Sequence, residues 1–178
     1  MARRFAKGLL WLFIIDLGIA FGAGVYEARI VVPEWIITAA DGGARWSAEA
    51  ARGDDTGRRF WVAVTTVPLT LLTLGNLIAA WRATGRVRRW WLGACAAAVA
   101  DRVFTFSYFI PTMIGLMQAE SSPAAVSSAL QWAELNHVRH LLVLTAWLAA
   151  LRTFSLVYRR EGEAARAAGV VQGGGIHG

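Results

Sequence analysis

Several ionisable side chains lie inside segments of this sequence that are otherwise apolar. Asp16 and Glu27 interrupt one such segment, and Arg139 and His140 interrupt another. A charged group at bilayer depth costs at least about 2.5–3.5 kcal/mol on insertion scales, so it normally faces protein or water. Carboxylate, guanidinium and imidazole groups can transfer protons and stabilise anions, so these residues are the first candidates for a site.

The polar residues recur at helical spacing. Asp16 and Glu27 are eleven residues apart, which turns an ideal helix by about 1,100° and leaves the two carboxylates only about 20° apart on one face. Similar stripes are formed by Thr66, Thr70 and Thr73, by Asp101, Thr105, Tyr108 and Thr112, and by Trp132, Asn136, Arg139, His140, Val143 and Trp147. We therefore expect a four-helix bundle that turns its polar stripes inward.

Depth along the predicted helices indicates which charges meet. At about 1.5 Å per residue, Glu27 and Arg139 lie level, each near the outer end of its helix. We predict an ion pair between Glu27 and Arg139, and another between Asp16 and Arg102 nearer the midplane. The outer half also gathers the remaining members of the candidate site, namely Tyr108, Asn136, His140, Trp35, Trp132 and Gln118.

Composition and breaks in the apolar runs give the fold class. The chain has 178 residues, of which 56% are hydrophobic, and this excess over a soluble domain must face lipid. We predict an all-α, integral membrane four-helix bundle in residues 1–160, with spans at about 8–32, 60–81, 90–117 and 134–158. Connections are expected at 33–59, with a short helix at 44–51, and at 118–131. Pro111 predicts a kink beside Tyr108, and the Gly-rich tail 161–178 is expected to be disordered and cytoplasmic.

The distribution of charge predicts topology rather than nucleic-acid binding. The net charge is +6, but the basic residues cluster at the ends of the apolar runs. Ten Arg and Lys residues flank one side of the predicted spans and four flank the other. This asymmetry places both termini in the cytoplasm, and we expect a multi-pass protein of a bacterial inner membrane whose partner is the lipid bilayer.

Cysteine and histidine usage limits the redox and metal chemistry. Cys95 is the only cysteine, so oxidoreductases that need a pair of cysteines are excluded. We expect Cys95 to be a small packing residue. His137 and His140 could form a two-His-one-carboxylate metal set with Glu27, but no further ligands are evident. A haem held by two histidines lacks a second histidine on another span. We therefore predict neither a metal nor another cofactor.

Three segments resemble a known family. They are Gly22–Trp35, which joins a Gly-rich helix to Glu27 and a Pro-x-Trp exit, Tyr108–Leu116 with its proline, and Trp132–Arg139, which has the form Trp-x-x-x-Asn-x-x-Arg. Together they resemble the anthrone oxygenase-like family of small four-helix integral membrane proteins, over roughly residues 8–155. The resemblance implies cofactor-independent oxidation of anthrone-type aromatics to quinones. It also implies a functional role for the residues at the matching positions, Glu27, Trp35, Asn136 and Arg139. His137 and His140 have no place in the shared pattern.

From this resemblance we expect an oxygenase-like enzyme acting on a hydrophobic aromatic or quinol-type substrate. The expected catalytic residues are Glu27, Asn136, Arg139 and His140, with either Glu27 or His140 as the base. Tyr108, Trp132 and Trp35 are expected to bind the substrate. The alternative is a non-catalytic helper subunit, or a carrier of small lipophilic molecules, in which the same polar groups only hold helices together. Gly18 and Gly22 form a small-residue pair that leaves a homo-oligomer open.

Overall fold

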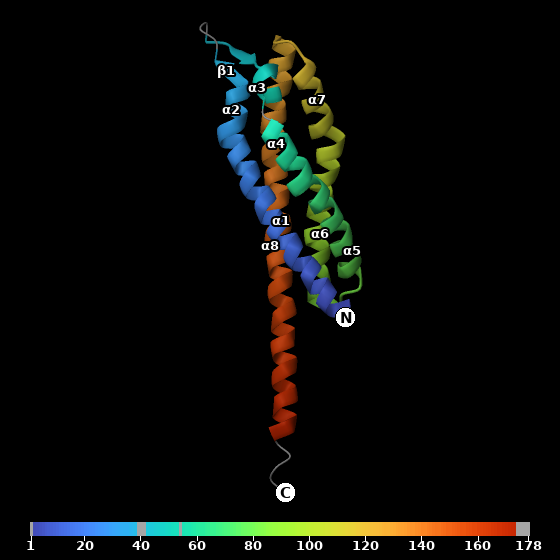
Figure 1. Cartoon of the computed structure of the whole chain (residues 1–178). Coiled ribbons are helices and arrows are strands. Elements are labelled where there is room, and N and C mark those ends of the chain that lie inside the picture. The colour runs from blue at the N-terminus through green and yellow to red at the C-terminus, as the bar shows by residue number, and fades with distance from the viewer. Residues whose placement is uncertain (1, 39–41, 54, 174–178) are drawn as a thin grey trace.

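The computed structural model describes residues 2–38, 42–53 and 55–173, and it is built almost entirely of helices (Figure 1). Four helical rods are long and apolar enough to cross a membrane: Arg4–Trp35, Gly57–Trp81, Gly85–Gln118 and Pro123–Glu163. Large apolar side chains cover their outer surface, and Leu71 and Leu141 are 64% and 63% exposed. A water-soluble domain rarely exposes so much apolar surface. The all-α class and the four span-length helices are therefore confirmed.

Each of the first three rods consists of consecutive helical segments. The first contains α1 (Ala2–Tyr26), η1 (Glu27–Val31) and α2 (Val32–Trp35), the second α4 (Asp55–Phe60), η2 (Trp61–Thr66) and α5 (Val67–Trp81), and the third α6 (Gly85–Phe104), η3 (Thr105–Phe109) and α7 (Ile110–Gln118). The fourth is one helix, α8 (Pro123–Gly173). We name the end with the α5–α6 connection the basic end, and the opposite end the hairpin end.

A proline follows each of the three π-helical turns. Val32, Val67 and Ile110, which directly precede Pro33, Pro68 and Pro111, donate their backbone N–H groups to the carbonyls of Glu27, Val62 and Thr105, each five residues back. A proline ring clashes with the carbonyl four residues before it, and a wider turn relieves that clash. The distortion predicted at Pro111 is thus a π-helical turn, and Pro33 and Pro68 produce the same turn in two other rods.

The hairpin end is closed by a small cap that the sequence did not reveal. Strands β1 (Ile36–Thr38) and β2 (Ala44–Trp46) pair antiparallel, with Ile36 opposite Trp46, and α3 (Ala48–Gly53) follows. The buried indole of Trp46 donates to the carbonyl of Leu116 over 2.7 Å. The helix predicted at 44–51 is therefore wrong in its first half, because Ala44–Trp46 is extended to bring Trp46 into the core, and Ser47 caps the helix that follows.

The fourth rod is longer at both ends than predicted. It begins at Pro123, where the Ser122 hydroxyl accepts from the backbone N–H of Ala125 and Pro123 occupies the first helical position. Most of the loop expected at 118–131 is therefore helix. At the other end α8 continues to Gly173 and projects beyond the bundle (Figure 1). Residues 161–173 thus lie in a helix where the sequence pattern predicts a disordered tail, and their Ala, Glu and Arg residues favour helix. Residues 174–178 lie outside the described residues.

The core of the basic half is held by a buried asparagine. Asn76 on α5 is fully buried, and its amide donates to the carbonyl of Leu9 on α1 over 3.0 Å. Its carbonyl oxygen accepts from the indole of Trp91 on α6, also over 3.0 Å. One side chain thus links three rods. Cys95 is fully buried in the same core, in agreement with a packing role.

Glycines let α1 approach α8 closely. A Cβ atom at Gly18 would lie 3.2 Å from the ring of Trp147, and one at Gly24 would lie 2.6 Å from Nε2 of His140. A Cβ atom at Gly22 would meet nothing within 4 Å. The small-residue pair that matters within the chain is therefore Gly18 and Gly24, whereas Gly22 faces open space.

Gly24→Ala tests this packing against Gly22→Ala as a matched control. The methyl group at position 24 must displace the imidazole of His140, and overpacking of this kind costs about 1–3 kcal/mol. At position 22 the methyl group enters open space, and the higher helix propensity of alanine stabilises by up to about 1 kcal/mol. Thermal unfolding of both variants in one detergent measures the difference. Equal stability of the two would contradict the described contact between α1 and α8.

Candidate functional site

A carboxylate buried between α6 and α8 organises the polar interior. Asp101 is completely buried, and its Oδ1 lies 3.3 Å from Nε of Arg139 on α8. Its Oδ2 accepts from Nε of Arg102 over 3.1 Å and also pairs with Nη2 of the same side chain. Nη1 of Arg139 donates to the Asn136 carbonyl oxygen over 3.1 Å. Asp101 therefore holds two arginines, and Asn136 orients one of them.

Both predicted ion pairs involve the wrong acid. The charge of Glu27 is close enough to act on Arg139, but the ion pair of Arg139 is with Asp101. Likewise Arg102 acts on Asp16 through space while its side chain binds Asp101. The physical reason is that Asp101 directly precedes Arg102 on α6 and faces Arg139 across the contact between α6 and α8. Its carboxylate therefore reaches both guanidinium groups at once.

The last residue of the π-helical turn η3, Phe109, packs against the guanidinium of Arg139. The guanidinium lies over the ring of Phe109, with its central carbon 4.6 Å from the ring centroid, a cation–π contact. The carbonyl of Phe109 accepts from the indole of Trp132 over 3.2 Å. The wide turn before Pro111 thus positions an aromatic ring beneath the cation and a carbonyl toward α8.

Two members of this cluster and two other buried residues carry polar atoms with unused hydrogen-bonding capacity. Within the described part of the chain, four buried side-chain atoms have no hydrogen-bond partner: Asp16 Oδ2, Arg102 Nη1, Asn136 Nδ2 and Trp147 Nε1. They come from α1, α6 and α8. Buried polar atoms normally have partners, and those without one often mark functional positions. The interior can therefore bind a proton, a water molecule or a polar ligand atom at these positions.

Glu27 lies at a different place, on the wall of a cavity. It is the first residue of η1, and its Oε1 accepts from the indole N–H of Trp61, the first residue of η2, over 2.7 Å. The cavity has a volume of about 400 Å³ and is lined by Ala23, Tyr26, Glu27, Val31, Gly57, Phe60 and Trp61. It is mainly apolar and aromatic, with one carboxylate in its wall and the positive charge of Arg139 within electrostatic range.

The two histidines do not assemble a metal site with Glu27. The rings of His137 and His140 are 6.1 Å apart, and Nε2 of His140 packs against Gly24 of α1. Among the residues that the structure describes, no three His, Cys, Asp or Glu side chains are grouped so that they could hold a metal ion. His140 does not border the cavity beside Glu27. A substrate in that cavity would therefore not contact His140, which does not favour its predicted role as a base.

The predicted substrate-binding aromatics lie in the core of the hairpin end. Trp35 and Trp132 are buried, with their ring centroids 6.2 Å apart, and Trp46 packs edge-on against Trp35. Tyr108 is half-buried, and its ring meets Phe109 edge-on at 5.1 Å. Packing explains these positions, and a role of Trp35, Trp132 or Tyr108 toward a ligand stays a prediction.

Sequence reasoning missed the aromatic residues that border the Glu27 cavity. Tyr26, Phe60 and Trp61 lie near the ends of predicted spans, where such residues usually form an interfacial belt. No local signal separates the two roles. Asp101 was recognised as part of a polar stripe, but its choice of partners depends on how α6 and α8 pack.

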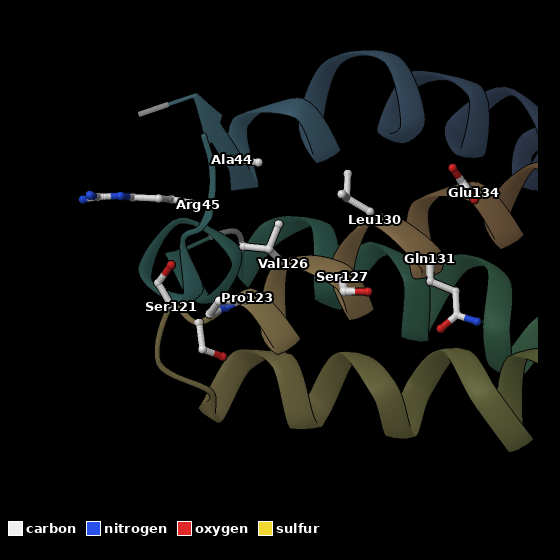
Figure 2. Close-up of a pocket in the computed structure, with 10 residues that line it drawn as sticks. Ala44, Arg45, Ser121, Pro123, Val126, Ser127, Leu130, Gln131 and Glu134 are labelled. Carbon is white, nitrogen blue, oxygen red and sulfur yellow. The ribbon is translucent and has the colours of Figure 1, made fainter. Parts of the chain in front are cut away.

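A larger hollow of about 680 Å³ lies between β2 and the first turns of α8 (Figure 2). Its lining includes Ser127, Gln131 and Glu134, whereas the side chain of Arg45 extends away from α8 (Figure 2). None of the predicted site residues lines it. It is therefore a surface depression of the cap rather than the candidate site.

Neither a scan against models of protein families nor searches of the curated proteins and of the solved structures found a match to this chain. Function must therefore be argued from the site itself.

Two double-mutant cycles test which acid pairs with Arg139. Asp101→Asn should cost about 3–5 kcal/mol, because it leaves two buried guanidinium groups without their carboxylate. Arg139→Gln should cost less, about 1.5–3 kcal/mol, because Asp101 keeps its pair with Arg102. The double variant should be more stable than the sum of these losses implies, by about 0.5–3 kcal/mol. The matched cycle of Glu27→Gln with Arg139→Gln should show a smaller coupling, because Glu27 acts on Arg139 only through space. Unfolding titrations in mixed micelles measure both, and a larger coupling in the Glu27 cycle would reverse the assignment.

Proposed function

We propose that this chain is a multi-pass membrane protein, similar to the anthrone oxygenase-like family, that oxidises a hydrophobic aromatic or quinol-type molecule with dioxygen and without a cofactor. The four apolar rods support the membrane location. The observation that carries the proposal is the aromatic cavity beside Glu27, whose carboxylate is oriented by Trp61 and lies within range of Arg139. The short sequence motifs around Glu27 and Arg139 support the family.

Glu27 is the base in this proposal. Its carboxylate borders the cavity, whereas His140 packs against α1. The carbonyl oxygen of Asn136 accepts a hydrogen bond from Arg139. Tyr26, Phe60 and Trp61 line the cavity and supply aromatic contacts for a flat aromatic molecule that enters from lipid. Arg139 stabilises the anion electrostatically, and Asp101 and Asn136 position it. A water-poor surrounding strengthens such charge interactions.

The proposed reaction balances with dioxygen as the only co-reactant. Glu27 takes one proton from an activated methylene group, and the electron pair left on carbon is delocalised into the aromatic system. The carbanion forms a C–O bond with dioxygen, and the peroxide oxygen regains the proton. Loss of water, which takes the second hydrogen of that carbon and breaks the O–O bond, leaves a carbonyl group. A methylene and dioxygen thus become a carbonyl and water, in a four-electron oxidation of the carbon.

For orientation we propose that the basic end faces the cytoplasm of a bacterium. The support is the excess of ten Arg and Lys residues over four. In this orientation the Glu27 cavity lies in the extracytoplasmic half of the bilayer.

The second candidate is a non-catalytic binding or helper subunit. It is favoured by the Asp101–Arg139–Asn136 network, which already satisfies most of its own charge, and by the indoles of Trp132 and Trp46, which bind backbone carbonyls. Such contacts stabilise helix packing without any ligand.

Oxygen consumption with an anthrone-type substrate separates the two candidates. Glu27→Gln keeps the size of the side chain but cannot accept the proton, so turnover should fall by about 10²-fold or more. Trp61→Phe removes the hydrogen bond that orients Glu27, and a loss of about tenfold is expected. Glu34→Gln, an exposed acid seven residues along the same rod, is the matched control and should keep full activity.

Absence of oxygen uptake by the wild type, or full activity of Glu27→Gln, would exclude the enzyme. Quenching of tryptophan fluorescence by the same substrate would then identify a binding protein, if Trp61→Phe reduced that quenching.

A further inference from the structure

Three arginines converge on a hollow between α6 and α8 at the basic end. The hollow has a volume of about 400 Å³ and is lined by Arg86, Arg89, Trp90, Arg152 and Leu156. Arg86, Arg89 and Trp90 have the i, i+3, i+4 spacing of one helix face, and Arg152 and Leu156 lie one turn apart on α8. No acidic side chain is part of this lining. The hollow is therefore a concentrated positive site.

Other cations at the same end are already engaged. Lys7 pairs with Glu161, Arg160 donates to the carbonyl of Thr84, and Arg88 lies over the ring of Trp81. By contrast, no hydrogen bond or ion pair joins Arg86, Arg89 or Arg152 to another side chain in residues 2–38, 42–53 and 55–173. Their guanidinium groups have donors to offer to an anion from outside.

The start of α6 adds to the positive potential. Arg86 and Arg89 lie in the first turns of this 20-residue helix, whose N-cap residue, Thr84, makes no side-chain capping hydrogen bond. The N-terminus of a helix carries about half a positive charge and favours anions. Helix and side chains thus act in the same direction.

Depth indicates that the anion comes from lipid. Arg152 precedes Arg159 by seven residues, which is about 10 Å along the helix, and it lies inside the fourth span-length rod. It is nevertheless exposed on the outside of the bundle. An unpaired guanidinium facing acyl chains is costly, and its long side chain reaches toward the headgroups. A lipid phosphate is the anion available at that level.

Apolar surface continues from the hollow along the same face. Trp90 is 46% exposed, and one turn further Gly93 leaves open space where a Cβ atom would stand. An acyl chain can therefore lie along this face beside Trp90 and Leu156 without meeting a side chain at position 93. Charge and apolar surface are therefore arranged as they are in an anionic phospholipid.

We propose that the hollow between α6 and α8 binds one anionic phospholipid from the leaflet at the basic end. Arg86, Arg89 and Arg152 hold the phosphate, and the acyl chain lies along Trp90 and Gly93. Guanidinium groups bind phosphate through paired hydrogen bonds, which favours Arg over Lys at such a site. The proposal rests on the membrane location proposed above and is independent of the oxygenase activity.

Native mass spectrometry of the full chain, released from detergent with added lipid, tests the site. We expect one phosphatidylglycerol molecule to be retained per chain, with an affinity about tenfold higher than that of phosphatidylcholine. Arg152→Gln should abolish this preference, and Arg152→Lys should weaken it. Arg159→Gln removes the same charge from the same helix outside the hollow and is the matched control, expected to keep the preference.

Stability in phosphatidylcholine nanodiscs provides a check on folding. If Arg152→Gln fails to fold there, Arg89→Gln on α6 replaces it with the same expected loss. Three results would overturn the proposal. The wild type could retain both lipids equally, or Arg152→Gln and Arg159→Gln could lose the preference for phosphatidylglycerol to the same extent. Inorganic phosphate alone could also stabilise the protein as much as phosphatidylglycerol does. The last would identify a site for a soluble anion.

Discussion

The interaction on which the rest of the interior depends is the one between the Asp101 carboxylate and two arginines. A fully buried carboxylate is tolerated only with charged or hydrogen-bonded partners, and Asp101 has Arg102 on its own helix and Arg139 on α8. Replacing Asp101 would leave two arginines without their carboxylate in an apolar bundle. The rotation of α6 against α8 is therefore fixed by electrostatics as well as by packing, and this rotation decides which groups the other rods meet.

The three proline-dependent turns place the polar groups where a regular helix would not. Glu27 and Trp61 each begin a π-helical turn and meet each other across two rods. Phe109 ends the third such turn and carries Arg139 on its ring. A π-helical turn rotates the following side chains relative to a continuous α-helix. The wide turns near the hairpin end thus aim side chains from three rods.

The two ends of the bundle present different chemistry to a membrane. The hairpin end is closed by an apolar cap of tryptophans and short strands, with the Glu27 cavity below it. The basic end carries Arg86, Arg89 and Arg152, which have no acidic partner among the residues that the structure describes. A lipophilic substrate and an anionic lipid would accordingly meet different halves of the protein.

Local periodicity in the sequence determined most of the architecture. Apolar runs gave four helices of span length, and helical spacing placed Asp16 with Glu27 and Asn136 with Arg139 on common faces. These properties depend only on neighbouring residues of one helix. The Ser122-Pro123 start of α8 carries a local signal too, a capping serine followed by proline, but the prediction of a loop at 118–131 missed it.

Only the tertiary structure decided which of these faces meet. Arg139 was assigned to Glu27 on depth alone, but the pair forms with Asp101, since the rotation and neighbours of each helix depend on all four rods together. Trp61 carries no local sign that it will orient Glu27, and Trp46 gives none that its strand will close the bundle. Helix faces follow from a period of 3.6 residues, whereas partners follow from packing over the whole molecule, which no single helix encodes.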